Sequence, residues 1–524
     1  MPYHKLEQRL SAIRDSGQAD VLSNPLIGLE KESLRVAESG GISQRRHPAS
    51  LGSALTNPYI TTDFSEALTE LITPPCKSIS DALGFLTDIH KFVYDQLRDE
   101  ILWATSMPCV LEGGSRIPIA QYGSSNAGLM KTVYRRGLGY RYGRSMQVIA
   151  GVHFNYSFSD EFWTLFQSLE GSTEDQQDFI SERYMGLVRN LMRFGWLIPY
   201  LFGASPAVCK SFIHGKQTMM SSFNETTAYE PFATSLRMGD IGYTNNKESM
   251  AGIKANYDSL QTYVDSLRCA IETPFDDYEK IGVKVDGEYR QLNANILQIE
   301  NEYYSTVRPK QILIGNEKPT TALAERGVQY IEIRSLDVNA YDPLGINEEQ
   351  LHFLETFVLF CLLHDSPVLT PSEINEIDMN IVQVAHLGRQ PGLKLTRNDE
   401  AIELKQWAGE VLDTMRAIAE CLDEVNNTDG YTHSINTQNT CIQDPEKTES
   451  ALILNDMRKN NEGFFHFARR MSLKHHEYFN SIKLDPARKT LFEDAAIYSI
   501  EQQHQIESED RISFDEFLNQ YFAQ

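Results

Sequence analysis

The sequence lacks most of the short motifs that identify an enzyme class directly. It contains no GxxxxGK[ST] phosphate loop, no GxGxxG, no kinase-like HRD, and neither HExxH nor GxSxG. Glycine-cradled phosphate sites, zinc proteases and hydrolases with a nucleophile elbow are therefore not indicated. If phosphate groups bind to this chain, metal ions and arginines must hold them.

Cysteines are few and scattered, and long apolar runs are missing. No two of the seven cysteines lie closer than 20 residues, so no CxxC pair exists, and we expect free thiols in a reducing compartment. The first residues predict a polar amphipathic helix with Leu6, Leu10 and Ile13 on one side, unlike a secretory signal. The apolar run Phe357–Leu363 is too short to cross a bilayer. We expect a cytoplasmic protein without membrane contact.

Positively charged residues are also much fewer than negatively charged ones. The 524 residues include 48 Lys and Arg against 72 Asp and Glu, a net charge of −24. Such a surface repels phosphate, so we expect no general binding of nucleic acid or of acidic membranes. The length allows two to four domains or one large core, and the 25 Phe and 24 Tyr are ample to fill it. No internal repeat or low-complexity linker divides the chain.

The segment Gly28–Val36 carries two carboxylates on one predicted strand face. Residues at positions i and i+2 of a strand point the same way, about 7 Å apart, so Glu30 and Glu32 share a face. Like charges on one face repel, and either water or a cation must compensate them. For an isolated exposed strand, water is the usual answer.

Further strands predict additional inward polar groups. Glu70 lies on the apolar face of its strand, where a charge is costly unless it is paired or bound to metal. The alternating segment Gln147–Phe158 predicts a half-buried strand with His153 on the polar face. In Val328–Asn339, Glu332 and Arg334 share a face.

Together these inward groups indicate a cation site. The set comprises Glu30, Glu32, Asp63, Glu70, His153, Glu332 and Arg334. Oxygen-rich ligands with one imidazole suit hard cations such as magnesium or manganese. An arginine two residues from a ligand carboxylate is well placed to stabilise a transferring phosphoryl group.

Three other stretches of the sequence predict further loops, strands and helices. Tyr134–Arg144 interleaves tyrosines, arginines and glycines, which predicts a loop that either binds anions or is simply solvated. Leu292–Tyr304 predicts another strand. After Pro343 helical patterns dominate, among them one long helix over about Glu446–Leu473. We expect residues 1–345 to form a catalytic core and residues 346–524 a mostly helical part packed on it.

Eight ordered segments resemble one enzyme family. They read GLEKESLRV, ITTDFSEALTELITP, AQYGSSNAG, MQVIAGVHFNYS, FGWLIPYLFGASPA, ATSLRMGDIGYTN, LQIENEYY and YIEIRSLDVN. In this order they resemble glutamate–cysteine ligase of the proteobacterial type, over residues 20 to 345. The family is related to glutamine synthetase. The resemblance implies an α+β fold in which an antiparallel β-sheet forms a cup-shaped active site surrounded by helices, with a helical C-terminal third.

The resemblance also implies ligand sets for two or three Mg²⁺ ions, with Mn²⁺ as a substitute. One ion would be held by Glu32, Asp63 and Glu70, and another by Glu30, His153 and Glu332, with Glu332 and Arg334 as catalytic residues. Arg237 matches the arginine that pairs with a substrate carboxylate. The other implied substrate positions are Phe64, Tyr134, Arg135, Leu138, Gln147, Ile149, Asn155, Tyr243 and Tyr304.

The implied reaction joins the γ-carboxylate of L-glutamate to the amine of L-cysteine through γ-glutamyl phosphate, with ATP consumed. It is the first step of glutathione biosynthesis, so glutathione is expected as a feedback inhibitor, and the chain is expected to be a monomer. Two alternatives stay open from the residues alone. One is a ligase with a different amine acceptor, and the other is a catalytically silent glutamate- or nucleotide-binding regulator.

Overall fold

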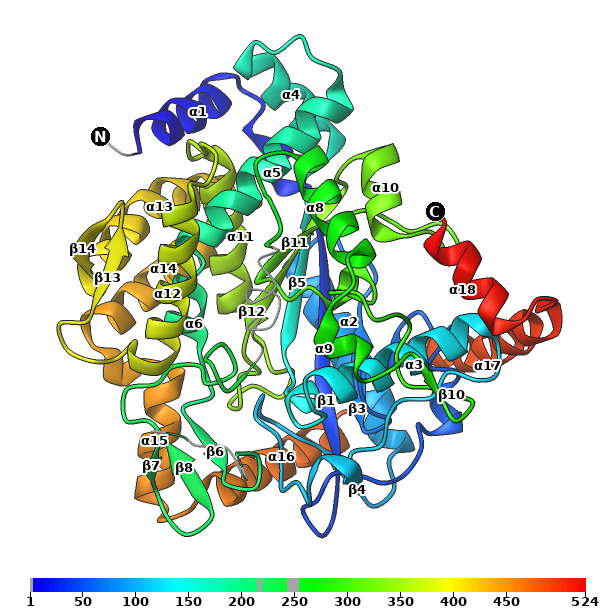
Figure 1. Cartoon of the computed structure of the whole chain (residues 1–524). Helices are drawn as coiled ribbons and strands as arrows, with labels where there is room; N and C mark the ends of the chain where they lie inside the picture. Colours follow the sequence, from blue (N-terminus) through cyan, green and yellow to red (C-terminus); the bar gives the residue numbers. More distant parts are fainter. Residues whose placement is uncertain (1–2, 214–217, 219, 243–253) are drawn as a thin grey trace.

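The computed structural model describes residues 3–213, 218, 220–242 and 254–524. A seven-stranded antiparallel sheet lies at its centre (Figure 1). Along the sheet the order is β11 (Val307–Lys310), β12 (Tyr330–Leu336), β5 (Val152–Ser157), β1 (Leu26–Ala37), β3 (Leu68–Ile72) and β2 (Ile60–Thr62), with β4 (Glu100–Leu102) paired to the end of β1.

The strand register places the predicted polar residues side by side. Glu30 on β1 lies opposite His153 on β5, and Glu32 lies opposite Glu70 on β3. Glu332 on β12 lies opposite Asn155 on β5. Because side chains alternate along a strand, these residues share one face of the sheet.

The opposite face is apolar and covered by helices. Leu29, Phe154 and Ile331 on three neighbouring strands have no exposed surface. Helix α2 (Ile79–Gln96) packs on β1 and β3, and α5 (Gln176–Phe194) packs on β11 and β12, while α11 (Glu348–Leu363) contacts both helices. Polar caps start these helices: the Ser78 hydroxyl accepts from the Asp81 N–H, and Asn347 forms a capping box with Gln350.

Shorter elements surround this core. In the described residues before 345, further helices are α1 (His4–Asp15), α3 (Asn126–Arg141), α4 (Asp160–Glu170), α6 (Leu197–Phe202), α8 (Leu260–Glu272), α9 (Asp276–Glu279) and α10 (Pro319–Arg326). Small sheets are formed by β6 (Ala207–Cys209), β7 (Ser221–Ser222) and β8 (Thr227–Tyr229), by β9 (Lys284–Val285) and β10 (Glu288–Tyr289), and by β13 (Lys394–Arg397) and β14 (Glu400–Glu403). Leu6, Leu10 and Ile13 of α1 are buried, as their spacing predicts.

The C-terminal helices wrap around the sheet. They are α12 (Pro371–Leu387), α13 (Leu404–Asn426), α14 (Gly430–Gln443), α15 (Glu449–Lys459), α16 (Phe464–Ser481), α17 (Pro486–Glu509) and α18 (Phe514–Phe522). In Figure 1 they run from the left of the sheet, beneath it and up its right side, and α18 contacts α3. One hydrophobic cluster extends from Leu6 to Phe492, so this part shares its core with the sheet. A boundary at residue 345 stays a prediction.

The predicted loop Tyr134–Arg144 is wrong: most of it belongs to helix α3. The Ser125 hydroxyl caps that helix by accepting from the Gly128 N–H. Its glycines serve close packing rather than a turn, because a Cβ atom on Gly137 would lie 2.1 Å from the Gln298 side-chain oxygen. The glycine-rich composition therefore gave a misleading signal.

The predicted strand Leu292–Tyr304 is also wrong. Side chains here form hydrogen bonds with nearby backbone groups, in place of the hydrogen bonds between strands of a sheet. The Gln298 backbone N–H donates to the Glu302 carboxylate at 2.7 Å, and Asn293 Nδ2 donates to the Gln298 carbonyl at 3.0 Å. Residues Glu300–Glu302 form a 3₁₀ turn.

Two boundaries differ from the predicted ones. The strand expected from Gln147 begins only at Val152, because Met146–Val148 form a 3₁₀ turn. The helix expected over Glu446–Leu473 is broken into α15 and α16, where Asn461 adopts a positive φ of 50°.

A buried carboxyl joins the back of the sheet to the C-terminal helices. Glu355 on α11 accepts from the Tyr156 hydroxyl of β5 at 3.2 Å and from the Tyr431 hydroxyl of α14 at 2.7 Å. Burial raises its pKa from 4.5 to about 7. A group whose pKa is higher in the folded state than in the unfolded state stabilises the fold when it is protonated. This contribution to the free energy of unfolding is fully present below the unfolded-state pKa and is lost as pH rises through the folded-state pKa.

We therefore expect Glu355→Gln to be more stable, relative to the unsubstituted chain, at pH 8 than at pH 5. The difference between the two pH values should be about 3 kcal/mol, since each pKa unit corresponds to about 1.4 kcal/mol. Urea unfolding at both pH values measures it. An equal stability difference at pH 5 and pH 8 would contradict the protonated state of this carboxyl.

No helix among the described residues is long and apolar enough to cross a membrane.

Candidate active site

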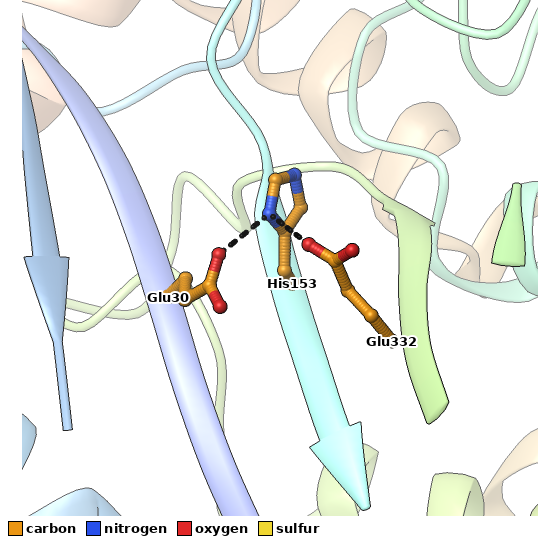
Figure 2. Close-up of side chains that lie close together, drawn as sticks. All are labelled: Glu30, His153 and Glu332. Atoms are coloured by element: carbon orange, nitrogen blue, oxygen red, sulfur yellow. Dashed lines mark hydrogen bonds and ion pairs between the residues drawn. The ribbon is translucent and has the colours of Figure 1, made fainter. Parts of the chain in front are cut away.

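Three ligand-type side chains from neighbouring strands point toward one another (Figure 2). His153 Nδ1 lies 3.1 Å from Glu30 Oε2 and 3.3 Å from Glu332 Oε1. One ligand atom from each of the three residues can be chosen so that all lie within 4.8 Å of one another. That spacing matches the mutual distances of atoms that coordinate one metal ion.

Charges in this group shift the protonation of its members. Burial opposes ionisation of Glu332, but Arg334, Lys310 and His153 hold its pKa well below the usual range. Burial and the Arg334 charge oppose protonation of His153, yet the carboxylates of Glu30 and Glu332 raise its pKa to about 9. A metal ion bound here would take the place of the imidazole proton.

A second acidic group lies beside the first one. Glu32 accepts from the Gly151 N–H at 2.7 Å, and burial raises its pKa. Burial together with repulsion from Glu30, Asp63 and Glu32 raises the pKa of Glu70 well above its usual value. Burial and mutual repulsion thus oppose ionisation of Glu32 and Glu70 in this group.

The donor set therefore fits divalent cations. Hard cations prefer carboxylate oxygens, tolerate an imidazole, and relieve the repulsion that raises the pKa of Glu70. Among the described residues, only Glu30, His153 and Glu332 bring their ligand atoms within the spacing of one metal site. Glu32, Asp63 and Glu70 line the same cavity, but the structure does not bring their ligand atoms together at that spacing.

These residues line a cavity of about 450 Å³. Its cations include Arg334, whose Nη1 lies 2.6 Å from Glu332 Oε1, and Lys310, whose Nζ lies 3.1 Å from Glu332 Oε2. Predicted site residues that line it are Glu30, Glu32, Asp63, Phe64, Glu70, Tyr134, Arg135, Leu138, Gln147, His153, Arg237, Tyr304, Glu332 and Arg334.

Three predicted substrate positions lie elsewhere. Ile149 is fully buried and does not line the cavity. It precedes β5, which begins at Val152, so the predicted alternation of strand faces does not apply to it. Asn155 is on β5 and does not line the cavity; it donates from Nδ2 to Glu30 Oε1 at 2.9 Å and so holds a carboxylate that does. Tyr243 lies outside the described residues.

Several cavity residues were not predicted from the sequence. Arg308 and Lys310 alternate along β11 and face the cavity with Glu332, a period-two signal that the sequence does contain. Lys131 joins them from α3, and burial and nearby Arg135 lower its pKa to about 8. Phe517 and Tyr521 come from α18, and no local pattern connects them to the strands.

Arg237 is held between two strands of the sheet. Its Nη2 donates to the Arg334 carbonyl at 2.8 Å, and its Nη1 lies 3.9 Å from Asp337 Oδ1. A Cβ atom on Gly151 would lie 2.2 Å from Nη2, so a glycine is needed there. Asp337 itself is buried and accepts from Ser205 and Ser235 hydroxyls at 2.6 and 2.9 Å.

The sequence as a whole matches known ligases. The sequence model described as Glutamate-cysteine ligase matches residues 10–384. The chain belongs to the glutamate–cysteine ligase family. It is therefore a ligase enzyme, and the family resemblance of its motifs is confirmed.

Relatives of similar length carry the same name. The glutamate–cysteine ligase of Alcanivorax borkumensis is 47% identical over 99% of both chains. That of Pseudomonas paraeruginosa is 45% identical over 99% of this chain and 98% of its own.

Solved structures place the fold in the same family. The glutamate–cysteine ligase of Francisella tularensis, in complex with AMP, superposes with a TM-score of 0.89 at 37% identity, covering 95% of this chain and 98% of that one. A bifunctional glutathione synthetase from Pasteurella multocida gives 0.72 at 25% identity, and the match covers 92% of this chain but only 58% of that longer one. The predicted α+β fold of the glutamine synthetase type, with helices around an antiparallel sheet, is confirmed.

Proposed function

We propose that this glutamate–cysteine ligase forms γ-glutamylcysteine from L-glutamate and L-cysteine with cleavage of ATP, through γ-glutamyl phosphate. One observation carries the proposal: carboxylates, one histidine and Arg334 from adjacent antiparallel strands face a single cavity. A carboxylate is a poor acyl donor because its oxygen is a poor leaving group. Phosphorylation of the γ-carboxylate supplies a good one, and the cysteine amine then displaces phosphate.

Arg334 is the residue proposed to stabilise the transferring phosphoryl group. Its guanidinium bears a fixed charge in a buried site, and Glu332 at 2.6 Å keeps it oriented toward the cavity. A planar donor pair matches two phosphoryl oxygens better than an ammonium group does.

Two groups of side chains are proposed to hold Mg²⁺, or Mn²⁺ in its place. They are Glu32, Asp63 and Glu70 in one group and Glu30, His153 and Glu332 in the other. Bound ions would neutralise phosphate charge and orient the acceptor carboxylate. Asn155 orients Glu30 by its hydrogen bond of 2.9 Å and thereby supports the second group.

The amino-acid substrates are proposed to bind along the other cavity walls. Arg237 would pair with a substrate carboxylate, since its guanidinium lies in the cavity between two strands. Arg135 lies on α3, where its Cζ stacks 4.6 Å from the Tyr122 ring and its Nε donates to the Asp63 carbonyl. The remaining proposed contacts are Phe64, Tyr134, Leu138, Gln147 and Tyr304.

ADP and γ-glutamylcysteine formation in the presence of Mg²⁺ tests this function, with L-glutamate and L-cysteine added singly and together. We expect both products only when both amino acids are present. ADP formation that depends on glutamate but ignores cysteine would indicate another amine acceptor. No ADP with any combination would support the silent regulator instead.

Asp337→Asn is expected to raise the KM of the amino acid whose carboxylate Arg237 binds by about 10-fold or more, with a smaller effect on kcat. The substitution removes one buried negative charge next to the guanidinium, and losing one partner of a buried pair is unfavourable. Steady-state kinetics with each amino acid varied in turn measures this effect.

Ser235→Ala is the matched control, because it removes one hydrogen bond to Asp337 but keeps the charge. Its KM values should stay within about fivefold of the unsubstituted enzyme, in line with a net value near 1 kcal/mol for one hydrogen bond. Equal effects of the two variants would contradict a positioning role for the Asp337 charge.

Other features of the enzyme also remain proposals. All seven cysteines are free thiols, which supports a cytoplasmic location. We also propose a monomer, feedback inhibition by glutathione, and a catalytic core within residues 1–345.

A further inference from the structure

Arg237 lies on a segment, residues 230–242, that forms neither a helix nor a strand. On the side of the sheet, the Leu236 N–H donates to the Ser205 carbonyl at 2.9 Å. On the opposite side the segment packs on α12, where the Thr234 N–H donates to a backbone carbonyl at 2.9 Å. Since the segment has no regular structure of its own, the place of Arg237 depends on these two neighbours.

One histidine of α12 contacts both flanks of this segment. His386 Nδ1 lies 2.8 Å from Glu230 Oε2, and His386 Nε2 lies 3.2 Å from Asp240 Oδ1. Glu230 precedes Arg237 in the chain and Asp240 follows it, so the imidazole bridges the two flanks. The fit is close, because a Cβ atom on Gly239 would lie 2.5 Å from His386 Nε2. A glycine there lets the backbone reach the ring.

The surroundings of this ring favour its protonated form. The hydrogen bond with Glu230 raises the pKa of His386 above its usual value, and Asp240 adds to this effect, while partial burial opposes it. Among the described residues, Glu230 and Asp240 are the charged groups in contact with the ring. When Nε2 loses its proton, it no longer donates to the Asp240 carboxylate and accepts from the Asp240 N–H at 3.3 Å instead. The two protonation states therefore hold the segment through contacts of unequal strength.

We propose that His386 is a positioning residue of the amino-acid site: its imidazolium ties Glu230 and Asp240 to α12 and thereby holds Arg237 in place for a substrate carboxylate. The inference rests on the proposed function, because it takes over the assignment of Arg237 to that carboxylate. His386 does not line the cavity, so it acts through residues 230–242. Substrate affinity then depends on the protonation of a histidine outside the cavity.

His386→Gln tests the proposal in the full-length enzyme by steady-state kinetics between pH 6 and pH 9.5. At pH 6 we expect the KM of the amino acid that Arg237 binds to rise about fivefold, with kcat changed less than about twofold, because the amide supplies no charge. The ratio of the two KM values should fall as pH rises, because His386 of the unsubstituted enzyme then loses its proton. Taking the ratio cancels the titration of the substrates. The same ratio at every pH would show that His386 only packs, and would overturn the proposal.

Asp240→Asn examines one of the two contacts in a variant that keeps the fold. The Asp240 side chain is 68% exposed, so its substitution leaves no buried group without a partner. At pH 6 we expect this variant to raise the same KM about twofold, and to add nothing when His386→Gln is already present. An equal increase in both backgrounds would show that the contact with His386 is not the cause, and would contradict the proposal.

His433→Gln is the matched control, and we expect it to leave all KM values unchanged. His433 of α14 is exposed, lies 3.9 Å from Glu349 Oε2 and does not line the cavity. Hydrogen exchange of the backbone amides in residues 230–242 reports on the segment independently of turnover, and should be faster in His386→Gln than in the control. Equal exchange in the two variants would overturn the proposal. If exchange is faster but no amino-acid KM changes, only the assignment of Arg237 to a substrate carboxylate fails.

Discussion

Glu332→Gln is expected to lower kcat for γ-glutamylcysteine formation by at least about 10³-fold, because it removes one negative charge from the proposed cation site and disturbs the partner of Arg334. The side chain is buried between His153, Lys310 and Arg334, so the amide keeps its volume but removes the negative charge that lies nearest to Lys310 and Arg334. Mg²⁺ should bind more weakly as well. Initial rates across a Mg²⁺ titration measure both effects.

Glu449→Gln is the control for this experiment. Glu449 is another buried carboxyl and accepts from Asn339 and Gln350 at 2.7 and 3.0 Å, but it does not line the cavity. Burial raises its pKa well above the usual range, so a neutral amide resembles its protonated form. We expect nearly unchanged activity for this variant. Full activity of Glu332→Gln would contradict the assigned cation site.

Arg334→Ala has the second large expected effect, a loss of about 10³-fold or more in kcat with a smaller change in ATP binding. An arginine that contacts the transferring phosphoryl group contributes mainly in the transition state, so kcat should fall more than affinity. Arg334→Lys should recover only part of the rate, because a single ammonium cannot replace the planar donor pair. Single-turnover formation of ADP separates the chemical step from product release.

Arg397→Ala serves as the control for loss of an arginine. Arg397 pairs with Glu410 at 2.7 Å on the surface of the C-terminal part and is absent from the cavity lining. Surface pairs of this kind contribute little to stability, so we expect unchanged kinetics. An Arg334→Ala enzyme that keeps its kcat would show that another group stabilises the phosphoryl transfer.

Period-two patterns identified the face of the sheet that carries the chemistry. Glu332 and Arg334 alternate with Ile331 and Ile333, which the structure buries, while Glu30 and Glu32 follow the buried Ile27 and Leu29 and flank Lys31. The strand faces follow from this period of two. The register between strands could not be predicted from these patterns. It depends on contacts between distant segments, such as the pairing of Glu30 with His153.

Features that depend on tertiary packing were misread or missed. Glycines in Tyr134–Arg144 suggested a loop, yet Gly137 allows a helix to approach the Gln298 side chain. Asp337 offers no motif, and its link to Arg237 appears only when the loop that carries Arg237 packs against the residue that follows β12. The contribution of α18 to the cavity was hidden for the same reason, because Phe517 lies far along the chain from all the strands that line the same cavity.

The most direct test of the account is the fate of oxygen from glutamate. L-Glutamate labelled with ¹⁸O in its γ-carboxylate is incubated with the enzyme, ATP, Mg²⁺ and L-cysteine, and the released phosphate is examined by mass spectrometry. If the γ-carboxylate attacks ATP and the amine then displaces phosphate, each phosphate formed carries one ¹⁸O atom, and γ-glutamylcysteine keeps the other. Unlabelled phosphate, released in step with γ-glutamylcysteine, would contradict an acyl phosphate at this site.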